Sequence, residues 1–242
     1  MLKIDDVAYE YHNECFHFDA TISSGDIVAL MGPSGAGKST LLALIAGFIE
    51  PQQGHILVEG KDVVGKVPSR RPFAMLFQEH NLFAHLSVRQ NIGLGLEPSL
   101  KLSAEQQQQV DKAAKQVGIA QYLDRLPEQL SGGQRQRVAL ARCFVQPHKV
   151  WLLDEPFSAL DAVTRHKLQT LSAELLKDKT VVLITHDPQE AVRLAHQLYV
   201  LQGTPAQAQH LVVPDSKPPR VLDGECAALQ QAILDQLEKD YE

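Results

Sequence analysis

Residues 32–39 have the types and the spacing of a loop that binds phosphate. They read Gly-Pro-Ser-Gly-Ala-Gly-Lys-Ser and fit the pattern G-x-x-x-x-G-K-[ST]. Glycines let the backbone curl so that successive N–H groups point at phosphate oxygens, while Lys38 reaches the β- and γ-phosphates and the Ser39 hydroxyl binds Mg²⁺. We therefore expect a nucleotide-binding loop formed by Gly32, Pro33, Ser34, Gly35, Ala36, Gly37, Lys38, Ser39 and Thr40.

Two carboxylates follow an apolar run further along the chain. Asp154 and Glu155 come directly after residues 150–153, at the expected end of a buried strand, which is where open α/β sheets bind ligands. We expect Asp154 to hold the magnesium ion through water and Glu155 to orient or deprotonate the water that attacks the γ-phosphate of ATP. Such a pair can also be structural, but the phosphate-binding loop upstream favours ATP hydrolysis.

A third segment, Leu130-Ser131-Gly132-Gly133-Gln134, precedes a predicted helix over 135–145. The N-terminus of that helix is an anion site by the same physics as the phosphate-binding loop. One nucleotide rarely needs two such sites. The segment therefore indicates that ATP is hydrolysed at a shared interface, to which the phosphate-binding loop and the segment 130–134 both contribute.

The hydrophobic pattern predicts the elements that position these residues. Short apolar runs at 27–31, 150–153 and 180–185 predict buried strands, and helices are predicted over 40–46 and 162–176. Strands that alternate with helices in this way indicate a parallel sheet that is covered on both faces. The expected fold class is therefore α/β.

Other segments predict additions to that sheet. Residues 1–31 suit an antiparallel β layer, and a further strand pair is expected at 54–60 and 73–77. Residues 87–146 are expected to form a helical subdomain, which contains a helix that begins at the N-cap Ser103.

Composition limits the class of protein. A chain of 242 residues suits one α/β domain with a subdomain better than two independent units. No apolar run approaches the roughly 20 residues of a membrane-spanning helix, and the acidic N-terminus lacks the apolar core of a secretory signal. Three cysteines at unrelated spacings suit reduced cytosolic thiols, and the net charge of −6 argues against a nucleic-acid partner.

The ordered set of motifs resembles the ATP-binding subunit of an ABC transporter. The set consists of the phosphate-binding loop, the segment 130–134, the pair Asp154–Glu155 and a histidine after a later strand, and the resemblance spans residues 1 to about 200. It implies a P-loop NTPase core of the ABC type with a parallel sheet, an N-terminal antiparallel β layer and a helical signature subdomain. It also implies that residues 1–242 form a single ABC ATPase domain.

The resemblance implies a dimer as the active form. In that family two subunits meet head to tail, and the signature segment of one subunit closes on the ATP that the other binds. Ser131 and Gly133 would then contact the γ-phosphate. The implied signature residues for the ATP of the second copy are Ser131, Gly132, Gly133 and Gln134.

Four further roles follow from the resemblance. Gln78 would bind the magnesium ion or its water and sense the γ-phosphate, and His186 would be the switch histidine, although a lone histidine in that place is more often structural. Asp161 would lie in the loop that lines the dimer interface. Tyr11 would stack on the adenine ring, with Tyr9 as the alternative.

A closer likeness, to the ATP-binding subunits of bacterial thiamine importers, rests on residues 69–72, 75–79, 81–83, 91–96 and 100–102. It predicts thiamine as the solute that is imported across the bacterial inner membrane. The open alternatives are a transporter of another solute such as iron or a polyamine, an exporter, and a soluble ABC ATPase.

The resemblance also implies cofactors and partners. ATP and Mg²⁺ would be bound by a chain that is peripheral at the cytoplasmic face of the inner membrane. Its partners would be a second copy, integral membrane permease subunits and, indirectly, a periplasmic substrate-binding protein. The apolar segment 81–86 is expected to help form the cleft for a helix of the permease. In residues 203–242 the glycine-marked hairpin of the family is not evident, and a helix-like stretch at 225–237 has no assigned function.

Overall fold

The structure is a computed structural model, and it describes residues 1–11, 14–78, 81–202 and 207–238. The chain divides into two compact units. The first unit consists of Met1–Phe73, Lys149–Asp154 and Leu176–Glu242, and the second of Ala74–His148 and Glu155–Leu175.

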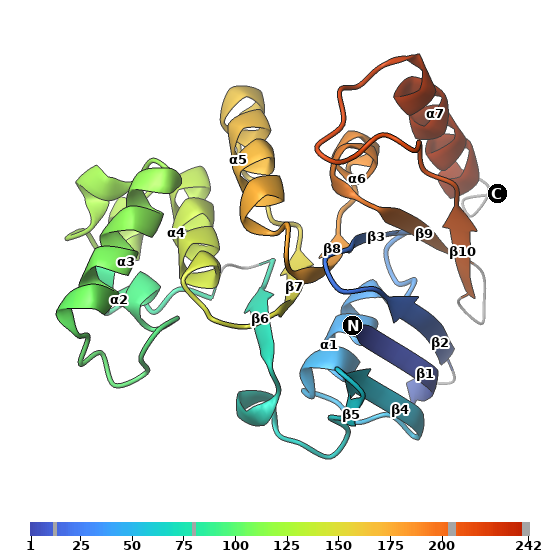
Figure 1. Ribbon diagram of the computed structural model, residues 1–242, viewed down its shortest axis with the longest axis horizontal. Coiled ribbons are helices and arrows are strands. Elements are labelled where there is room, and N and C mark those ends of the chain that lie inside the picture. The colour runs from blue at the N-terminus through green and yellow to red at the C-terminus, as the bar shows by residue number, and fades with distance from the viewer. Residues whose placement is uncertain (12–13, 79–80, 203–206, 239–242) are drawn as a thin grey trace. The chain divides into compact units, whose positions relative to one another are not determined.

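An antiparallel sheet in the first unit has the strand order β2-β1-β4-β5 (Figure 1). β1 pairs with both β2 and β4, so that Ile4 stands opposite Ile56, and the apolar residues of this register are buried. The antiparallel layer predicted for residues 1–31 is therefore present. The strands are β1 (Leu2–Tyr11), β2 (Glu14–Ile22), β4 (Gln53–Val58) and β5 (Lys61–Asp62).

The predicted pairing of the strands at 54–60 and 73–77 is wrong. β4 turns back into β5 at Glu59 and Gly60, whose φ angles are 50° and 74°. Two consecutive residues with positive φ form a two-residue hairpin turn whose twist matches the flanking strands. β4 therefore finds its partners in β1 and β5, and β6 (Phe73–Leu76) forms a strand outside that sheet.

The other strands of the first unit run in the order β10-β9-β3-β8-β7. The pairs β3–β8, β3–β9 and β7–β8 are parallel, and every residue of β3 and β8 is buried, as uninterrupted apolar runs in a covered parallel sheet require. The strands are β3 (Ile27–Met31), β7 (Val150–Asp154), β8 (Thr180–Ile184), β9 (Gln197–Gln202) and β10 (Gln207–Leu211), and the helices of the unit are α1 (Lys38–Ala46), the short 3₁₀ turn η1 (Pro68–Arg70), α6 (Pro188–Leu194) and α7 (Gly224–Glu238).

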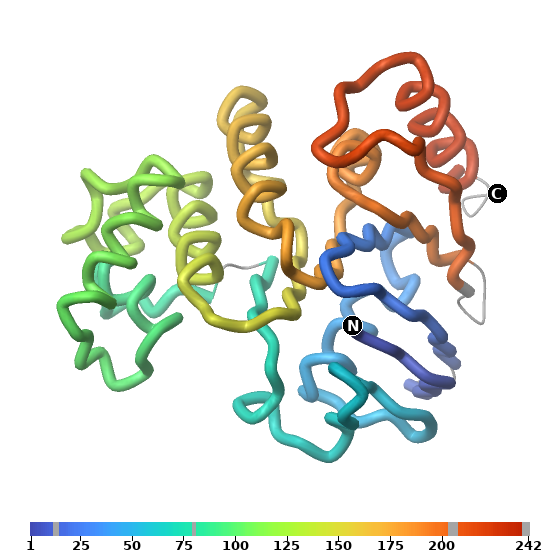
Figure 2. The backbone as a smooth tube through the Cα atoms, in the orientation of Figure 1, coloured from blue at the N-terminus to red at the C-terminus, as the bar shows by residue number. Residues whose placement is uncertain are grey.

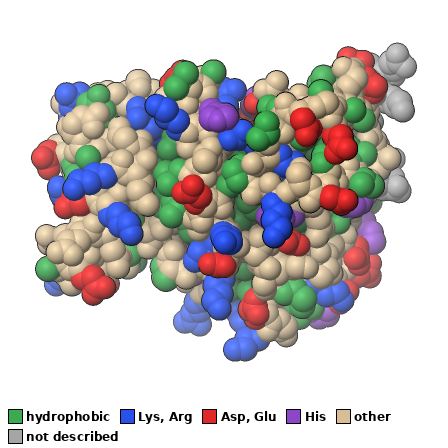
Figure 3. All heavy atoms as spheres, turned by 45° about the horizontal axis from the view of Figure 1, so that its top comes forward, with side chains coloured by type: hydrophobic (Ala, Val, Ile, Leu, Met, Phe, Trp, Pro, Cys, Tyr) green, Lys and Arg blue, Asp and Glu red, His purple; other side chains and the backbone are tan. Residues whose placement is uncertain are grey.

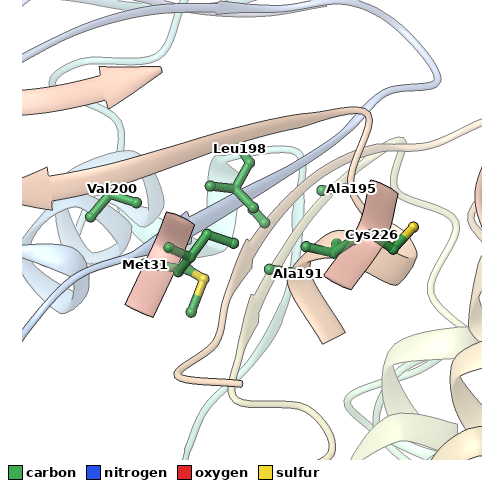
Figure 4. Close-up of a cluster of buried hydrophobic side chains, with 9 residues drawn as sticks. Met31, Ala191, Ala195, Leu198, Val200 and Cys226 are labelled. Carbon is green, nitrogen blue, oxygen red and sulfur yellow. The ribbon is translucent and has the colours of Figure 1, made fainter. Parts of the chain in front are cut away.

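The described residues of the tail, 207–238, are an integral part of the first unit. β9 and β10 form an antiparallel pair, although the glycine-marked hairpin of the family is not evident in the sequence; Gly203 lies outside the described residues. The helix predicted at 225–237 is α7. Its residues Cys226 and Ile233 are fully buried in a cluster with side chains of β3, α6 and β9 (Figure 4).

Arg220, in the segment between β10 and α7, holds the C-terminal end of α6. Its Nη1 donates to the carbonyl oxygens of Val192 at 2.9 Å and Ala195 at 2.6 Å, and its Nη2 donates to that of Pro214 at 3.0 Å. Figure 2 shows the trace of this segment alongside α6. The carbonyl groups that a helix leaves unsatisfied at its C-terminus are thus bonded by a side chain from the tail.

Arg71 bonds the C-terminal carbonyl groups of α1, the helix that follows the phosphate-binding loop. Its side chain is fully buried, and Nη1 donates to the carbonyl oxygens of Leu44 at 2.8 Å and Ile45 at 3.0 Å. Nε donates to Lys66 O at 2.8 Å, and Nη2 forms an ion pair with Glu50 Oε1 at 2.9 Å. Arg71 therefore joins the end of α1 to two later segments.

We expect the substitution Arg71→Ala to lower the free energy of unfolding by about 2–4 kcal/mol, because it removes several charge-assisted hydrogen bonds and leaves helix carbonyls unbonded in a buried place. For a chain of this size the melting temperature should fall by roughly 5–15 °C in a circular dichroism melt. Arg70→Ala is the matched control, since Arg70 is exposed. Equal melting temperatures for the two variants would contradict the role given to Arg71.

The second unit contains helices α2, α3, α4 and α5, and the helical segment predicted at 87–146 lies within it. Ser87, Ser103 and Ser131 each accept a hydrogen bond from a backbone N–H three residues later, where a glutamine side chain returns the bond. Such reciprocal capping fixes where a helix begins. The elements are α2 (Val88–Gly93), α3 (Ala104–Gln116), α4 (Gly132–Phe144) and α5 (Ala162–Leu175), with short 3₁₀ turns at Ala120–Tyr122 and Pro127–Gln129.

Among the described residues no helix has both the length and the apolar character needed to cross a bilayer. All three cysteines are free; Cys15 is exposed, and burial raises the pKa of Cys143 to about 12. Basic and acidic side chains are interspersed on the face that Figure 3 shows.

Candidate active site

The phosphate-binding loop lies between β3 and α1, and its glycines have backbone conformations that few other residues adopt. The φ angles of Gly32, Gly35 and Gly37 are 149°, 88° and 87°. A Cβ at Gly37 would lie 2.5 Å from Cδ1 of Phe16, so the position admits glycine alone. Gly37 is the N-cap of α1 and forms no side-chain cap, and the first turn has no acidic residue. The first N–H groups of α1 are therefore suited to an anion.

Lys38 lies across this loop. Its Nζ donates to the carbonyl oxygens of Gly32 and Pro33, at 2.7 Å in each case. The half-buried lysine side chain is thus held against the loop. Ser39 is exposed, and a Cβ at Gly35 would meet open space. The loop combines a fixed positive charge with room for a phosphate group.

The register of the parallel sheet brings three predicted site segments to one edge. Ile184 at the end of β8 stands opposite both Leu30 of β3 and Asp154 of β7. The phosphate-binding loop, Asp154 and His186 therefore leave the sheet at neighbouring positions, as expected for the ligand edge of an open α/β sheet. His186 is exposed, and Asp187 next to it caps α6 by accepting from Gln189 N at 2.9 Å.

The chain changes direction at Glu155, directly after β7. Glu155 has φ 48°, a left-handed conformation that is uncommon for a residue with a side chain. Its carbonyl oxygen accepts from Ser158 Oγ at 3.2 Å. The second predicted carboxylate therefore stands on a tight turn and not on the strand itself.

Gln136 of α4 holds that turn, and no motif in the sequence points to this residue. The side chain is fully buried; Nε2 donates to Glu155 O at 2.9 Å, and Oε1 accepts from Ala159 N at 2.9 Å. No local pattern announces such a contact, because its partners lie 19 and 23 residues away along the chain.

The signature helix begins earlier than predicted. α4 starts at Gly132, not at residue 135, because Ser131 and Gln134 form a capping box: Gln134 N donates to Ser131 Oγ at 3.3 Å, and Ser131 N to Gln134 Oε1 at 2.8 Å. The side chains of Ser131 and Gln134 thus bond to the backbone, while Gly132 and Gly133 carry N–H groups of the first turn, which have no acceptor within a helix.

The turn at residues 158–161 lies against this helix start. A Cβ at Gly133 would be 2.9 Å from Ala159 O, so only glycine allows this approach. Asp161 is exposed just before α5, and its Oδ1 accepts a hydrogen bond from Thr164 N at 3.0 Å. Hydrogen bonding by Thr164 lowers the pKa of the Asp161 carboxyl group. The second unit therefore brings together the signature residues, Glu155 and Asp161.

Gln78 is exposed two residues after the end of β6, and the apolar segment 81–86 is held in a fixed shape. Asn91 is fully buried; its Oδ1 accepts from Phe83 N at 2.8 Å, and its Nδ2 donates to Leu86 O at 2.9 Å. Arg142 Nη1 donates to Asn81 O at 2.8 Å. The ring of Phe83 remains half exposed above this scaffold.

The two candidate adenine-stacking residues lie on the same strand, β1. Tyr11 is 58% exposed, whereas Tyr9 is half-buried and stands opposite Phe16, the residue that covers Gly37. A stacking residue must present a ring face to the ligand. The exposure favours Tyr11, and Tyr9 keeps its place as the alternative.

These features fit a magnesium nucleotide. An uncapped helix start, a lysine and glycine N–H groups suit phosphate oxygens, and a hydroxyl and a carboxylate are the oxygen ligands that Mg²⁺ prefers. The loop, Asp154 and His186 belong to the first unit, and Gln78, Glu155 and the signature residues belong to the second.

Comparisons with known proteins were consistent with one another. A model described as ABC transporter matches residues 16–158. A thiamine import ATP-binding protein, ThiQ, of Vibrio cholerae serotype O1 is 64% identical over 206 residues, which are 84% of this chain and 87% of that protein. Its namesake in Vibrio parahaemolyticus serotype O3:K6 is 62% identical over 206 residues, with coverage of 84% and 88%.

Solved structures are similar as well. The dimeric post-hydrolysis state of the ATP-binding cassette MJ0796, bound to ADP and Pi, superposes with a TM-score of 0.79 at 28% identity. The likeness covers 89% of this chain and 100% of that one.

Proposed function

Because this chain belongs to the ABC transporter family, we propose that it is the ATP-hydrolysing subunit that energises the import of thiamine across the bacterial inner membrane. The observation that carries the thiamine assignment is the 64% identity with a protein named for thiamine import, over 87% of that protein. Hydrolysis itself is supported by the chemistry of the sheet edge, where a phosphate-binding loop and a carboxylate leave the two strands that flank β8.

In the proposed mechanism the first unit binds ATP. The N–H groups at the start of α1 and the ammonium group of Lys38 bind the phosphates, and Tyr11 stacks on the adenine. Ser39, Asp154 and Gln78 would hold Mg²⁺. When bound, that ion neutralises charge on the β- and γ-phosphates.

Glu155 is the proposed base. Its carboxylate accepts a proton from the water that attacks the γ-phosphate in line, and ADP leaves on the opposite side. His186 would bond to the γ-phosphate from the edge of the same sheet as the loop. A base needs a fixed direction, and the turn that carries Glu155 is tied at its carbonyl by Gln136 and Ser158.

We place the second half of each site on another copy of the chain. In a head-to-tail dimer the N–H groups of Gly132 and Gly133 and the hydroxyl of Ser131 face the γ-phosphate that the partner binds, while Gln134 keeps the helix start in shape. Asp161 lies at the interface. Dimerisation then completes both sites, so hydrolysis depends on protein concentration.

The proposed membrane partners are permease subunits, and through them a periplasmic substrate-binding protein. The segment 81–86 is the proposed contact with the permease, since its shape is fixed by Asn91 and Arg142 and its Phe83 is half exposed. The chain would then be peripheral at the cytoplasmic face of the inner membrane.

The test is ATPase activity in liposomes that hold the chain with its permease. We expect thiamine-loaded substrate-binding protein to raise the rate several-fold, because the loaded protein favours the closed dimer. The double variant Leu82→Asp with Phe83→Asp should lose this stimulation and keep nucleotide binding. A rate that depends on Glu155 but ignores thiamine would remove the thiamine assignment and keep the ATPase.

A further inference from the structure

Gln136 lies in the second turn of α4, and both the nitrogen and the oxygen of its side-chain amide form hydrogen bonds. Its Nε2 donates to Glu155 O at 2.9 Å and to Ser158 Oγ at 3.4 Å, and its Oε1 accepts from Ala159 N at 2.9 Å. The side chain is 0% exposed. One buried group thus bonds both ends of the turn that carries the proposed base.

The turn needs such support. Glu155 has φ 48°, and a non-glycine residue keeps this conformation only where the surroundings hold it. The backbone sets the direction of the Cα–Cβ bond from which a side chain extends. The hydrogen bond from Gln136 to the Glu155 carbonyl therefore helps to fix the direction in which the side chain of Glu155 leaves the turn.

A second contact joins the same helix to the same turn. A Cβ at Gly133 would stand 2.9 Å from Ala159 O, so the backbones of the helix start and the turn are in direct contact. α4 cannot shift toward the turn unless the turn follows it, because packed interiors are not freely compressible, and the hydrogen bonds of Gln136 oppose a shift away from the turn.

We propose that Gln136 is a positioning residue that couples the two ATP sites of the dimer. This inference rests on the proposed function, in which Ser131 faces the ATP of the partner while Glu155 acts on the ATP of its own chain. Ser131 and Gln136 are separated by a rise of about 7.5 Å along one rigid helix. When Ser131 engages the nucleotide of the partner, Gln136 carries the position of the helix directly to Glu155.

The test compares the wild type with Gln136→Ala in the permease complex. We expect kcat to fall by about 100-fold, the usual scale for a displaced catalytic group. The Hill coefficient for ATP should fall toward 1, because each site would no longer sense the other. ATP binding to the isolated chain should stay within about twofold, since the phosphate-binding loop belongs to the other unit.

Gln146→Ala is the matched control. Gln146 follows the far end of α4, and its Nε2 donates to Arg142 O. Its substitution should leave kcat and the Hill coefficient close to the wild-type values.

The isosteric variant Gln136→Glu tests the hydrogen bond itself. A protonated carboxyl group can donate to the Glu155 carbonyl, whereas an ionised one cannot, and burial raises the pKa of a carboxyl group. Its kcat relative to the wild type should therefore rise as the pH is lowered from about 8.5 to about 6. Loss of general packing would give no such recovery.

The proposal is overturned if Gln136→Ala keeps the kcat and the Hill coefficient of the wild type. It is also overturned if both variants lose kcat and ATP affinity in parallel and the glutamate variant shows no recovery at low pH. Failure of the proposed function is seen separately: the wild type would then hydrolyse no ATP, or would do so equally well with Glu155→Gln.

Discussion

The variant Glu155→Gln should bind ATP with the affinity of the wild type and hydrolyse it about 100- to 10,000-fold more slowly, the range expected when a general base is removed. The amide has nearly the shape of the carboxylate but cannot accept the proton of the attacking water. Gln136 and Ser158 bond to the backbone carbonyl of residue 155, so the turn itself should persist. Phosphate release in the permease complex measures the rate.

Glu174→Gln provides the matched control for that experiment. Glu174 is an exposed glutamate on α5 of the same unit, so its neutralisation changes the net charge equally without changing the turn. A Glu155→Gln variant that hydrolyses ATP at even a tenth of the wild-type rate would contradict the role of this carboxylate as the base.

The second large effect is expected for Lys38→Ala, which should weaken ATP binding by roughly 10- to 100-fold. A charge-assisted bond to phosphate is worth about 1.5–3 kcal/mol, and each 1.4 kcal/mol is a factor of ten in affinity. The variant also loses the two 2.7 Å bonds that tie Nζ to Gly32 and Pro33, so the loop is less well ordered. Titration with a fluorescent ATP analogue measures the affinity.

Lys61→Ala is the control for the loss of a positive charge in the same unit, because Lys61 is exposed on β5. Its affinity for the analogue should equal that of the wild type. If Lys38→Ala bound the analogue as tightly as Lys61→Ala, the loop would not bind phosphate in the way that we propose.

Features that depend on a few consecutive residues could be predicted from the sequence. The buried strands β3, β7 and β8 appear as apolar runs, and their common direction follows from the helices between them. These two signals are enough to place Asp154 at the same sheet edge as the phosphate-binding loop. The α/β class with an ABC-type P-loop core is confirmed by the likeness to solved ABC cassettes.

Features that depend on distant contacts could not be predicted. β4 pairs with β1, and apolar alternation alone does not say which strand is the partner of which. Gln136 meets Glu155 across 19 residues, and Arg71 reaches Leu44 across 27, so neither has a signal in its own neighbourhood.

One difference between the predicted and the observed elements does have a local signal. The start of α4 at Gly132 follows from the capping box that Ser131 and Gln134 form, and a serine followed three residues later by glutamine is readable in a sequence. Ser103 and Gln106 form the same box at the start of α3, where the N-cap is predicted correctly. In the signature segment the two glycines draw attention to an anion site. The capping box of Ser131 and Gln134, which flank the glycines, is the signal that gives the correct start of the helix.

The burial of Arg71 at the end of α1 also has an electrostatic consequence for the other end of that helix. An α-helix has a partial negative charge at its C-terminus and a partial positive charge at its N-terminus. The guanidinium group neutralises the negative pole, about 14 Å from the start of the helix, and leaves the positive pole uncompensated. Although Glu50 offsets part of its charge, Arg71 thereby acts on the electrostatic potential of the loop from the far end of the helix, through an interior that salt screens only weakly.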